Sequence, residues 1–412
     1  MSRKRGIAMP QLELERHDVK MMQELAANLL EHNLEQYSAL AVTPDGHPDS
    51  RAWSSIQKRE GIRVFKESAR QQQLQIKAQA GTGNGSANSA QSPPSLLLMG
   101  TVMGNLDDVL YATAASSTEA MRIKSKCTDD GTVDCKVLAR IVEPTMADPL
   151  HFLNVTWRYY ALSEPRDYVC LDVAGFSHTA GGERVAYHLI HSVGFDALPT
   201  FANRGVARAN MSVCWIFRQR TATHVECYAR GFYDFDTPNA MLNAISLHTI
   251  ASQWLSCAKL VACAQNIKLS RLLHGGKGAS SSDGSESDSG DCTPDYDPSR
   301  SQTLSSSMSS SSVVLLPVPP GPAKIPASRC KVCCKSFRFL GASRRSCKAC
   351  DEDVCSRCSV KQSLYLFSHK KQEAVERKTN FCSQCVTDAT RSEAGAAARD
   401  DLVASMQTND SW

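Results

Sequence analysis

The hydrophobic pattern of the chain changes from a helical to a strand-like period near residue 50. Between residues 12 and 40 apolar side chains recur every three or four positions, which predicts an amphipathic helix. After residue 53 apolar and polar residues alternate in short runs, which predicts strands. These runs cover residues 53–67 (a strand pair), 96–104, 135–142, 154–160, 168–174, 184–191, 211–217 and 223–228.

A second helical pattern closes this region. Thr237 and Pro238 form an expected N-cap and first-turn proline. Leu247, Ala251 and Trp254 follow with helical spacing in a helix expected to run to about residue 273. One helix, many antiparallel strands and a long terminal helix together predict an α+β domain over residues 10–273.

Two tracts lack the apolar residues that a core requires. Residues 71–94 are rich in Gln, Ser, Gly and Asn, and residues 274–327 are dominated by Ser, Asp, Gly and Pro. Such segments bury too little apolar surface to offset chain entropy, so we expect both to be disordered. The first is then an insert in the N-terminal domain. The second is a linker to a module at 328–391, which a tail at 392–412 follows.

The 412 residues show neither a signal-peptide pattern nor an apolar run of the roughly 18 residues that a membrane span requires. We therefore expect a cytoplasmic protein. In a reducing compartment clustered cysteines bind metal rather than form disulfides. A disulfide-linked secreted module is the alternative.

Four Cys-x-x-Cys pairs dominate the last module, and each pair can direct two sulfurs at one tetrahedral ion. They are Cys330 and Cys333, Cys347 and Cys350, Cys355 and Cys358, and Cys382 and Cys385. Only four residues separate the second pair from the third, too few for an independent finger. We therefore expect an interleaved arrangement of two Zn²⁺ ions, the first pair with the third and the second with the fourth. Cys334 directly follows a complete pair, so we do not expect it to be a metal ligand.

Charge is concentrated in the same module. The whole chain has a formal net charge of +4, but residues 324–391 contain fifteen Lys or Arg against six Asp or Glu, a local excess of +9. A small basic module predicts an acidic partner such as an anionic lipid surface. A merely solvated basic surface is the alternative.

The segment from Ser328 to Ala389 resembles the FYVE zinc finger, a phosphoinositide-binding module of endosomal proteins. The resemblance lies in Phe337, in the run Arg344–Cys350 (RRSCKAC) and in Cys358–Lys361 (CSVK). Before Cys347 the family's two histidines and its leading arginine are missing. The zinc scaffold is therefore better preserved than the lipid headgroup site.

This resemblance implies contact with phosphoinositides or other anionic lipids through Arg344, Arg345 and Lys348. Phe339 and Leu340, in the preceding loop, would enter the lipid interface; alternatively they cap the small core. Each basic residue near an anionic surface contributes about 1 kcal/mol. We therefore expect weak peripheral binding, on endosomal membranes if the resemblance extends to localisation.

The N-terminal region resembles the START domain, a helix-grip fold in which a curved sheet wraps the last helix around an apolar lipid cavity. The landmarks are Trp53–Phe65, Gly100–Val109 and the helix that contains Trp254. The resemblance implies a lipid ligand. A START-like domain joined to a FYVE-like finger is a combination of the kind found in oomycetes.

These features together predict a non-enzymatic lipid-binding adaptor with a START-like cavity and a membrane-directed finger. A protein-interaction scaffold and an enzyme in the cavity are the alternatives. An open apolar tunnel would favour lipid binding, a cavity filled by large side chains the scaffold, and a buried His with a carboxylate partner the enzyme. The sequence has no Gly-x-Ser-x-Gly motif, and its basic segment lacks the interleaved aromatics of nucleic-acid binders.

Overall fold

The computed structural model describes residues 9–43, 45–73, 93–235, 239–273, 328–337 and 344–409. The expected linker at 274–327 lies outside these residues, as do most of the expected insert at 71–94 and both Phe339 and Leu340. Among the described helices, none combines the length and the apolar character that crossing a bilayer requires.

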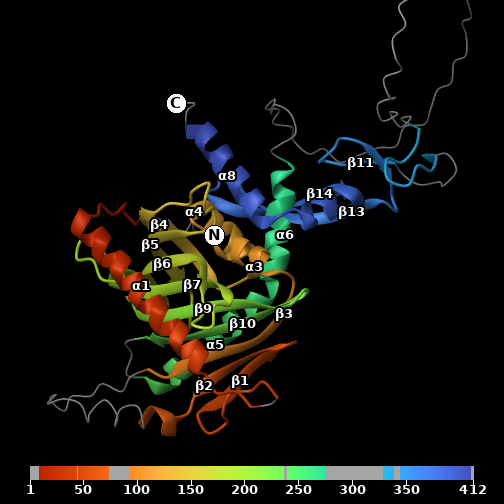
Figure 1. Ribbon diagram of the computed structural model, residues 1–412. Helices are drawn as coiled ribbons and strands as arrows, with labels where there is room; N and C mark the ends of the chain where they lie inside the picture. Colours follow the sequence, from red (N-terminus) through yellow and green to blue (C-terminus); the bar gives the residue numbers. More distant parts are fainter. Residues whose placement is uncertain are drawn as a thin grey trace, which may run out of the picture.

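A curved, mainly antiparallel sheet forms the body of the molecule (Figure 1). Its strand order is β1-β2-β3-β10-β9-β7-β6-β5-β4, and the short β8 pairs in parallel with β6. The strands are β1 (Trp53–Arg59), β2 (Ile62–Glu67), β3 (Ser95–Met103), β4 (Thr132–Val142), β5 (Phe152–Tyr160), β6 (Arg166–His178), β7 (Arg184–Ser192), β8 (Ala207–Arg208), β9 (Asn210–Thr221) and β10 (His224–Asp234).

Helices cover both faces of this sheet. On one face lies α1 (Arg16–Ala39), which buries Met22 and Ala26. The opposite, concave face packs against the remaining helices of the domain. These are α3 (Leu106–Thr113), α4 (Thr118–Thr128), α5 (Ala240–Trp254) and α6 (Leu260–Arg271), with the 3₁₀ turn η2 (Leu255–Lys259) between the last two and η1 (Ala202–Arg204) in a connection.

Burial on both faces explains why the central strands are so apolar. Along β9, Met211, Val213 and Phe217 belong to the core on the concave face, whereas Cys214 and Ile216 belong to the core beneath α1. Successive side chains of a strand point to opposite faces, so a strand covered on both sides needs apolar residues at both parities. A charged side chain on the concave face therefore differs clearly from its apolar surroundings.

This architecture confirms the expected fold class: an α+β domain, in which a curved antiparallel sheet packs around the C-terminal helices, joined to a small cysteine-rich module. The described part of the terminal helix begins at Ala240 behind the N-cap Asn239, whose side chain accepts from the N–H groups of Met241 and Leu242. The expected cap at Thr237 and Pro238 lies outside the described residues. One detail differs from expectation: the helix is interrupted by η2 and continues as α6.

The cysteine-rich module, here called the finger (residues 328–391), consists of two hairpins and a short helix. Its elements are β11 (Arg344–Ser346), β12 (Asp353–Cys355), β13 (Ser359–Ser368), β14 (Glu373–Cys382) and α7 (Ser383–Arg391). The next segment forms a further helix, α8 (Ala394–Asn409).

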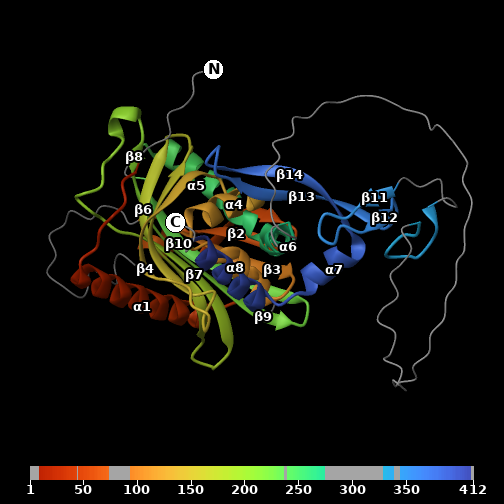
Figure 2. The same ribbon diagram turned by 90° about the horizontal axis from the view of Figure 1, so that it is seen from above.

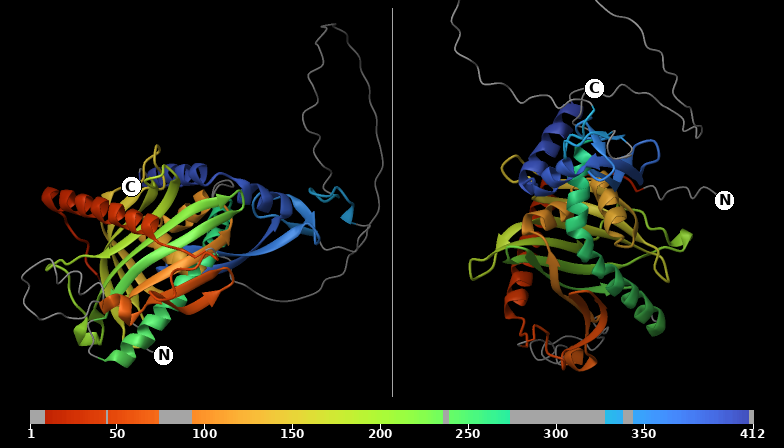
Figure 3. Two further views of the ribbon diagram at one scale, coloured as in Figure 1. Left: turned by 60° about the horizontal axis from the view of Figure 1, so that its bottom comes forward. Right: turned by 90° about the vertical axis from the view of Figure 1, so that its right-hand side faces the viewer.

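The finger and α8 pack directly on the domain (Figures 2 and 3). Leu269 of α6 is buried in the hydrophobic core of the finger, and the side chain of Asn266 bonds the backbone of β13 through Ser363 O (2.7 Å) and Tyr365 N (3.1 Å). In the other direction, alanines of α8 are buried in the core of the domain: Ala394, Ala397 and Ala398. Helix α6 is thus shared by two cores.

Candidate ligand cavity and metal centres

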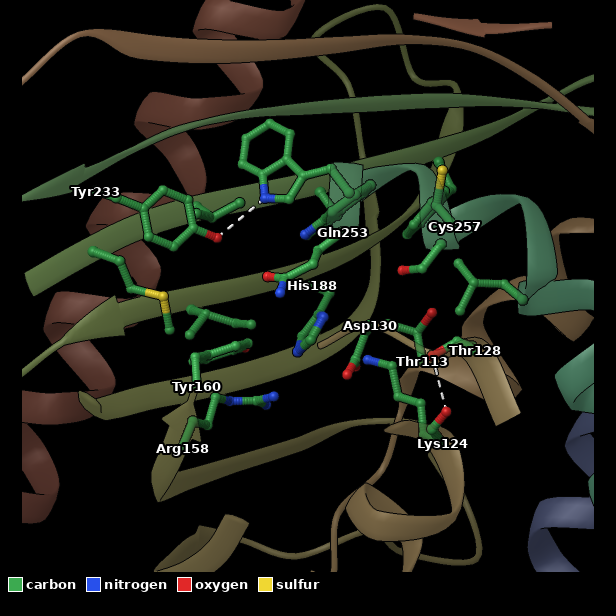
Figure 4. A pocket seen from close by; sticks show the side chains of 18 residues that line it. Thr113, Lys124, Thr128, Asp130, Arg158, Tyr160, His188, Tyr233, Gln253 and Cys257 are labelled. Atoms are coloured by element: carbon green, nitrogen blue, oxygen red, sulfur yellow. Dashed lines mark hydrogen bonds between the residues drawn. The ribbon is translucent and has the colours of Figure 1, made fainter. Parts of the chain in front are cut away.

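A cavity of about 680 Å³, counting the mouth that opens to solvent, lies between the concave face of the sheet and η2. Its walls come from α4, strands β5, β7, β9 and β10, and the α5–η2–α6 segment. Figure 4 shows the labelled polar side chains, with Lys124, Thr113 and Asp130 together at one end and Tyr233 at the other.

Aromatic and aliphatic side chains form most of the wall away from Lys124. The indole nitrogen of Trp254 donates to Tyr233 OH across 3.0 Å, and the rings of Trp215 and Trp254 lie 5.4 Å apart. These contacts fix the aromatic rings in place. The wall is completed by Ile190, Met211, Val213, Phe217 and Leu260. Such a surface gains free energy by taking an apolar ligand out of water.

Three buried polar residues from neighbouring strands meet at the centre of the concave face. Asp172 of β6 accepts from the guanidinium of Arg158 of β5, and its other oxygen lies 2.8 Å from His188 Nε2 of β7. Thr156 Oγ1 also donates to Asp172, across 3.3 Å. All three strands supply these residues from positions of the same parity, so the side chains converge on one face.

Their environment determines their protonation. Burial by itself would raise the pKa of Asp172, but the positive charge of Arg158 and the bond from His188 hold it well below its ordinary value. Burial and the nearby charge of Lys124 lower the pKa of His188 to about 4, against the attraction of Asp172. Near neutral pH the centre therefore consists of an ionised Asp172, a charged Arg158 and a neutral His188 whose Nε2–H donates.

Lys124 of α4 reaches the cavity from the other side. Burial, followed by repulsion from Arg158, lowers the pKa of its ammonium.

The neighbouring wall residue Gln253 packs against the α4–β4 turn at Gly131, which has a φ of +82°. A Cβ at Gly131 would come within 2.0 Å of the Gln253 amide, so glycine is required there both for the backbone and for this close approach.

In the finger, the eight paired cysteines gather in the two interleaved groups that the spacing predicts. One group contains Cys330, Cys333, Cys355 and Cys358, and the other contains Cys347, Cys350, Cys382 and Cys385. Within each group the sulfurs lie within 4.8 Å of one another. Four sulfur donors at this separation suit a soft, tetrahedral metal ion. Two groups of cysteines that can each hold a metal ion are therefore present.

Backbone geometry supports the same pairing. Cys334 and Asp351 each follow the second cysteine of a turn, each has a positive φ of 56°, and each donates its N–H to the first cysteine's carbonyl across 2.8 Å. The two turns are thus built alike. Cys334 is exposed and belongs to neither cysteine group in the described residues.

Backbone donors favour thiolates at the buried first positions. Burial alone would raise the pKa of Cys330, but N–H groups that include those of Cys333 and Cys355 lower it to about 6. Burial and neighbouring sulfurs instead raise the pKa of Cys350 to about 11. Four thiols in one site do not readily ionise together, because the thiolates repel one another, and a bound dication compensates this repulsion.

The three residues expected to contact lipid headgroups differ in their ion pairs. Arg344 forms an ion pair with Asp353 of the neighbouring strand β12. Arg345 and Lys348 have no ion-pair partner among the residues that the structure describes. β11 and β12 lie at the end of the finger away from the sheet (Figure 2), and all three residues of β11 are exposed. The expected insertion residues Phe339 and Leu340 lie outside the described residues.

The polar centre of the cavity was not predicted from the sequence. Arg158 and Asp172 lie inside expected strands, where a charged residue within an apolar run such as VCLDVA is the signal that identifies them. His188 occupies a similar place in β7. Lys124 belongs to a helix that was not expected, so nothing in the hydrophobic pattern directed it to the cavity.

The sequence matches no protein-family model and no curated protein. Among solved structures, it is similar to human StAR-related lipid transfer protein 5, with 14% identity, a TM-score of 0.40, and coverage of 59% of this chain and 97% of that chain. It is also similar to human STARD10, with 10% identity, a TM-score of 0.37, and coverage of 64% and 86%. Because these identities are low, the ligand of this chain must be inferred from its own residues.

Proposed function

We propose that this protein is a non-enzymatic lipid-binding adaptor, in which the START-like cavity holds a lipid and the finger directs the chain to an anionic membrane. The observation that supports this proposal is the cavity itself. It combines an aromatic and aliphatic wall with a compact polar centre of Arg158, Asp172 and His188. The apolar body of a lipid would contact the aromatic and aliphatic wall, and its polar group would contact the polar centre.

The finger supplies the membrane contact in this proposal. Two zinc ions bound by the interleaved cysteines would fix the backbone of β11 and the adjoining turn. Arg345 and Lys348 then face solvent at the end of the molecule farthest from the sheet. Their attraction to phosphoinositides or other anionic lipids would be weak, and peripheral binding to endosomal membranes is the localisation that the FYVE-like pattern favours.

Mass spectrometry of lipids that co-purify with the full-length chain tests the cavity. Val213 is 2% exposed and lines the cavity, so Val213→Trp should fill it and displace the lipid. Val133, which is 59% exposed on β4, provides the matched control Val133→Trp. We expect lipid in the wild type and in the control, and its loss from Val213→Trp. Equal lipid content in all three proteins, or none in any, would contradict the proposal.

One observation favours an enzyme as the second candidate. His188 is a buried, neutral imidazole hydrogen-bonded to a carboxylate and facing a cavity, an arrangement that can serve general acid–base chemistry. However, the positive charge of Arg158 already balances that of the ionised Asp172, and the Nε2–H of His188 already donates to Asp172. Turnover of a lipid ester by the purified chain that disappears in His188→Gln, while lipid binding persists, would establish the enzyme.

A further inference from the structure

The ammonium nitrogen of Lys124 borders the cavity but makes no hydrogen bond or ion pair with any other residue that the structure describes. The carboxylate of Asp130 attracts this ammonium electrostatically but forms no hydrogen bond with it; its Oδ1 accepts from Ser125 Oγ (2.9 Å) and from the backbone N–H of Thr132 (3.0 Å). A charged group in such a place is costly unless something compensates it.

A second donor at the same end is also unsatisfied. The Nη2 of Arg158 is bound to Asp172, but its Nε is buried without a hydrogen-bond partner. Asp172 accepts from Arg158 Nη2, His188 and Thr156, but not from Lys124 or from Arg158 Nε. The polar end of the cavity therefore offers two donors, the Lys124 ammonium and Arg158 Nε, that hydrogen-bond to no described residue.

The apolar wall limits what can supply the missing acceptor. Trp215, Phe217 and Trp254 continue from this polar end and favour an apolar chain over a free ion. We propose that the cavity binds a single-chain amphiphile with one anionic group, a carboxylate or a phosphate monoester, which lies against Lys124 and Arg158 Nε with its chain along the tryptophans. This inference rests on the proposed lipid-binding function and names the class of ligand.

The protonation of Lys124 adds a consequence that a neutral ligand would not produce. Burial and Arg158 lower the pKa of Lys124 in the free protein, and an anion within hydrogen-bond distance of the ammonium would raise this pKa again. Binding should therefore take up a fraction of a proton at alkaline pH. The other groups that act on this ammonium are Asp130, Arg158 of β5, Asp172 of β6, His188 of β7 and Cys263 of α6.

Isothermal titration of the full-length chain with dodecanoate, dodecyl phosphate, dodecanol and inorganic phosphate tests the inference. We expect both anionic amphiphiles to bind at least about tenfold more tightly than dodecanol, because a hydrogen bond to a charged group is worth more than that factor. Lys124→Met should reduce dodecanoate binding to the level of dodecanol, whereas Lys124→Arg should retain it. Lys126→Met, at an exposed position of the same helix, is the matched control.

Repeating the dodecanoate titration at pH 9 in buffers of different ionisation enthalpy measures the proton uptake, which should vanish in Lys124→Arg. Dodecanol binding as tightly as dodecanoate would overturn the anionic ligand but leave lipid binding intact. Inorganic phosphate binding as tightly as dodecyl phosphate would overturn the amphiphile. Absence of binding by every amphiphile would instead contradict the proposed function itself.

Discussion

Lys268 of α6 donates to Asp108 of α3 across 2.6 Å, and the same ammonium donates to the carbonyl of Ser392 across 2.6 Å. Both side chains are almost fully buried, with 1% and 5% of their surface exposed. One lysine therefore joins the terminal helix of the domain, the helix that follows β3, and the connection between the finger and α8.

Removing the carboxylate of this pair should destabilise the assembled molecule. Asp108→Ala leaves Lys268 buried with only a carbonyl, and such a loss typically costs about 3–5 kcal/mol of unfolding free energy. Lys20→Ala, which removes an exposed pair with Glu24, should cost at most about 1 kcal/mol. Urea denaturation of both variants checks this. Equal, small effects would mean that Lys268 finds another partner.

Replacing a buried metal ligand should release one ion and unfold the finger. Cys355 is 1% exposed, and its N–H also donates to Cys330 Sγ across 3.4 Å. We expect Cys355→Ser to reduce the zinc content measured by elemental analysis from two ions to one or fewer. Cys334→Ser should leave it at two, because that sulfur is exposed and outside both groups. Fewer than two ions in the wild type would refute the assignment.

Burial of neutral His188 should make stability depend on pH. Its pKa is about 4 in the folded protein and about 6.5 when unfolded, so the unfolded state binds more protons between these values. The stabilisation is complete above pH 6.5 and is lost as the pH falls to 4, by roughly 3 kcal/mol. Denaturation curves across this range should show a shallower dependence for His188→Gln. Identical curves would place the imidazole in water.

The finger's affinity for membranes should depend on Arg345 and Lys348, which form no ion pair with any described residue. Changing Arg345 and Lys348 together to Glu should abolish pelleting with vesicles of anionic lipid at low salt, and salt should weaken wild-type binding. The same charge change at exposed Lys20 and Lys126 of the domain is the control. Asp353→Asn should strengthen binding, because it releases Arg344. Salt-resistant binding selective for one phosphoinositide would indicate a specific headgroup site instead.

The strands were predictable because each is a short run of apolar residues, alternating at the sheet edge and nearly continuous in the centre, bounded by polar turns. Each expected strand run overlaps a strand of the sheet. Helix α3 (Leu106–Thr113) escaped detection for a physical reason: its eight residues make about two turns, fewer than the 11–18 residues over which a helical period can be recognised. Sequence spacing likewise favoured the interleaved cysteines, because a four-residue gap leaves little choice of pairing.

Contacts between distant segments could not be predicted in this way. The centre of the cavity depends on Arg158, Asp172 and His188 meeting across three strands, and the docking of the finger depends on Asn266 and Lys268 contacting residues more than 90 positions away. Such pairs leave no periodic signal in one sequence. Only the charge inside an apolar strand marks Asp172 in advance.

The sharing of α6 between two cores has a thermodynamic consequence. Leu260 lines the cavity, Cys263 is buried in the domain core, and Leu269 is buried beside the cysteines of the finger. A metal in the finger and the proposed amphiphile in the cavity would therefore act on one helix from opposite ends. Whatever factor metal loading adds to ligand affinity, ligand must add to metal affinity, because linkage is reciprocal. If chelation weakens amphiphile binding, a filled cavity must therefore raise the finger's affinity for metal by the same factor.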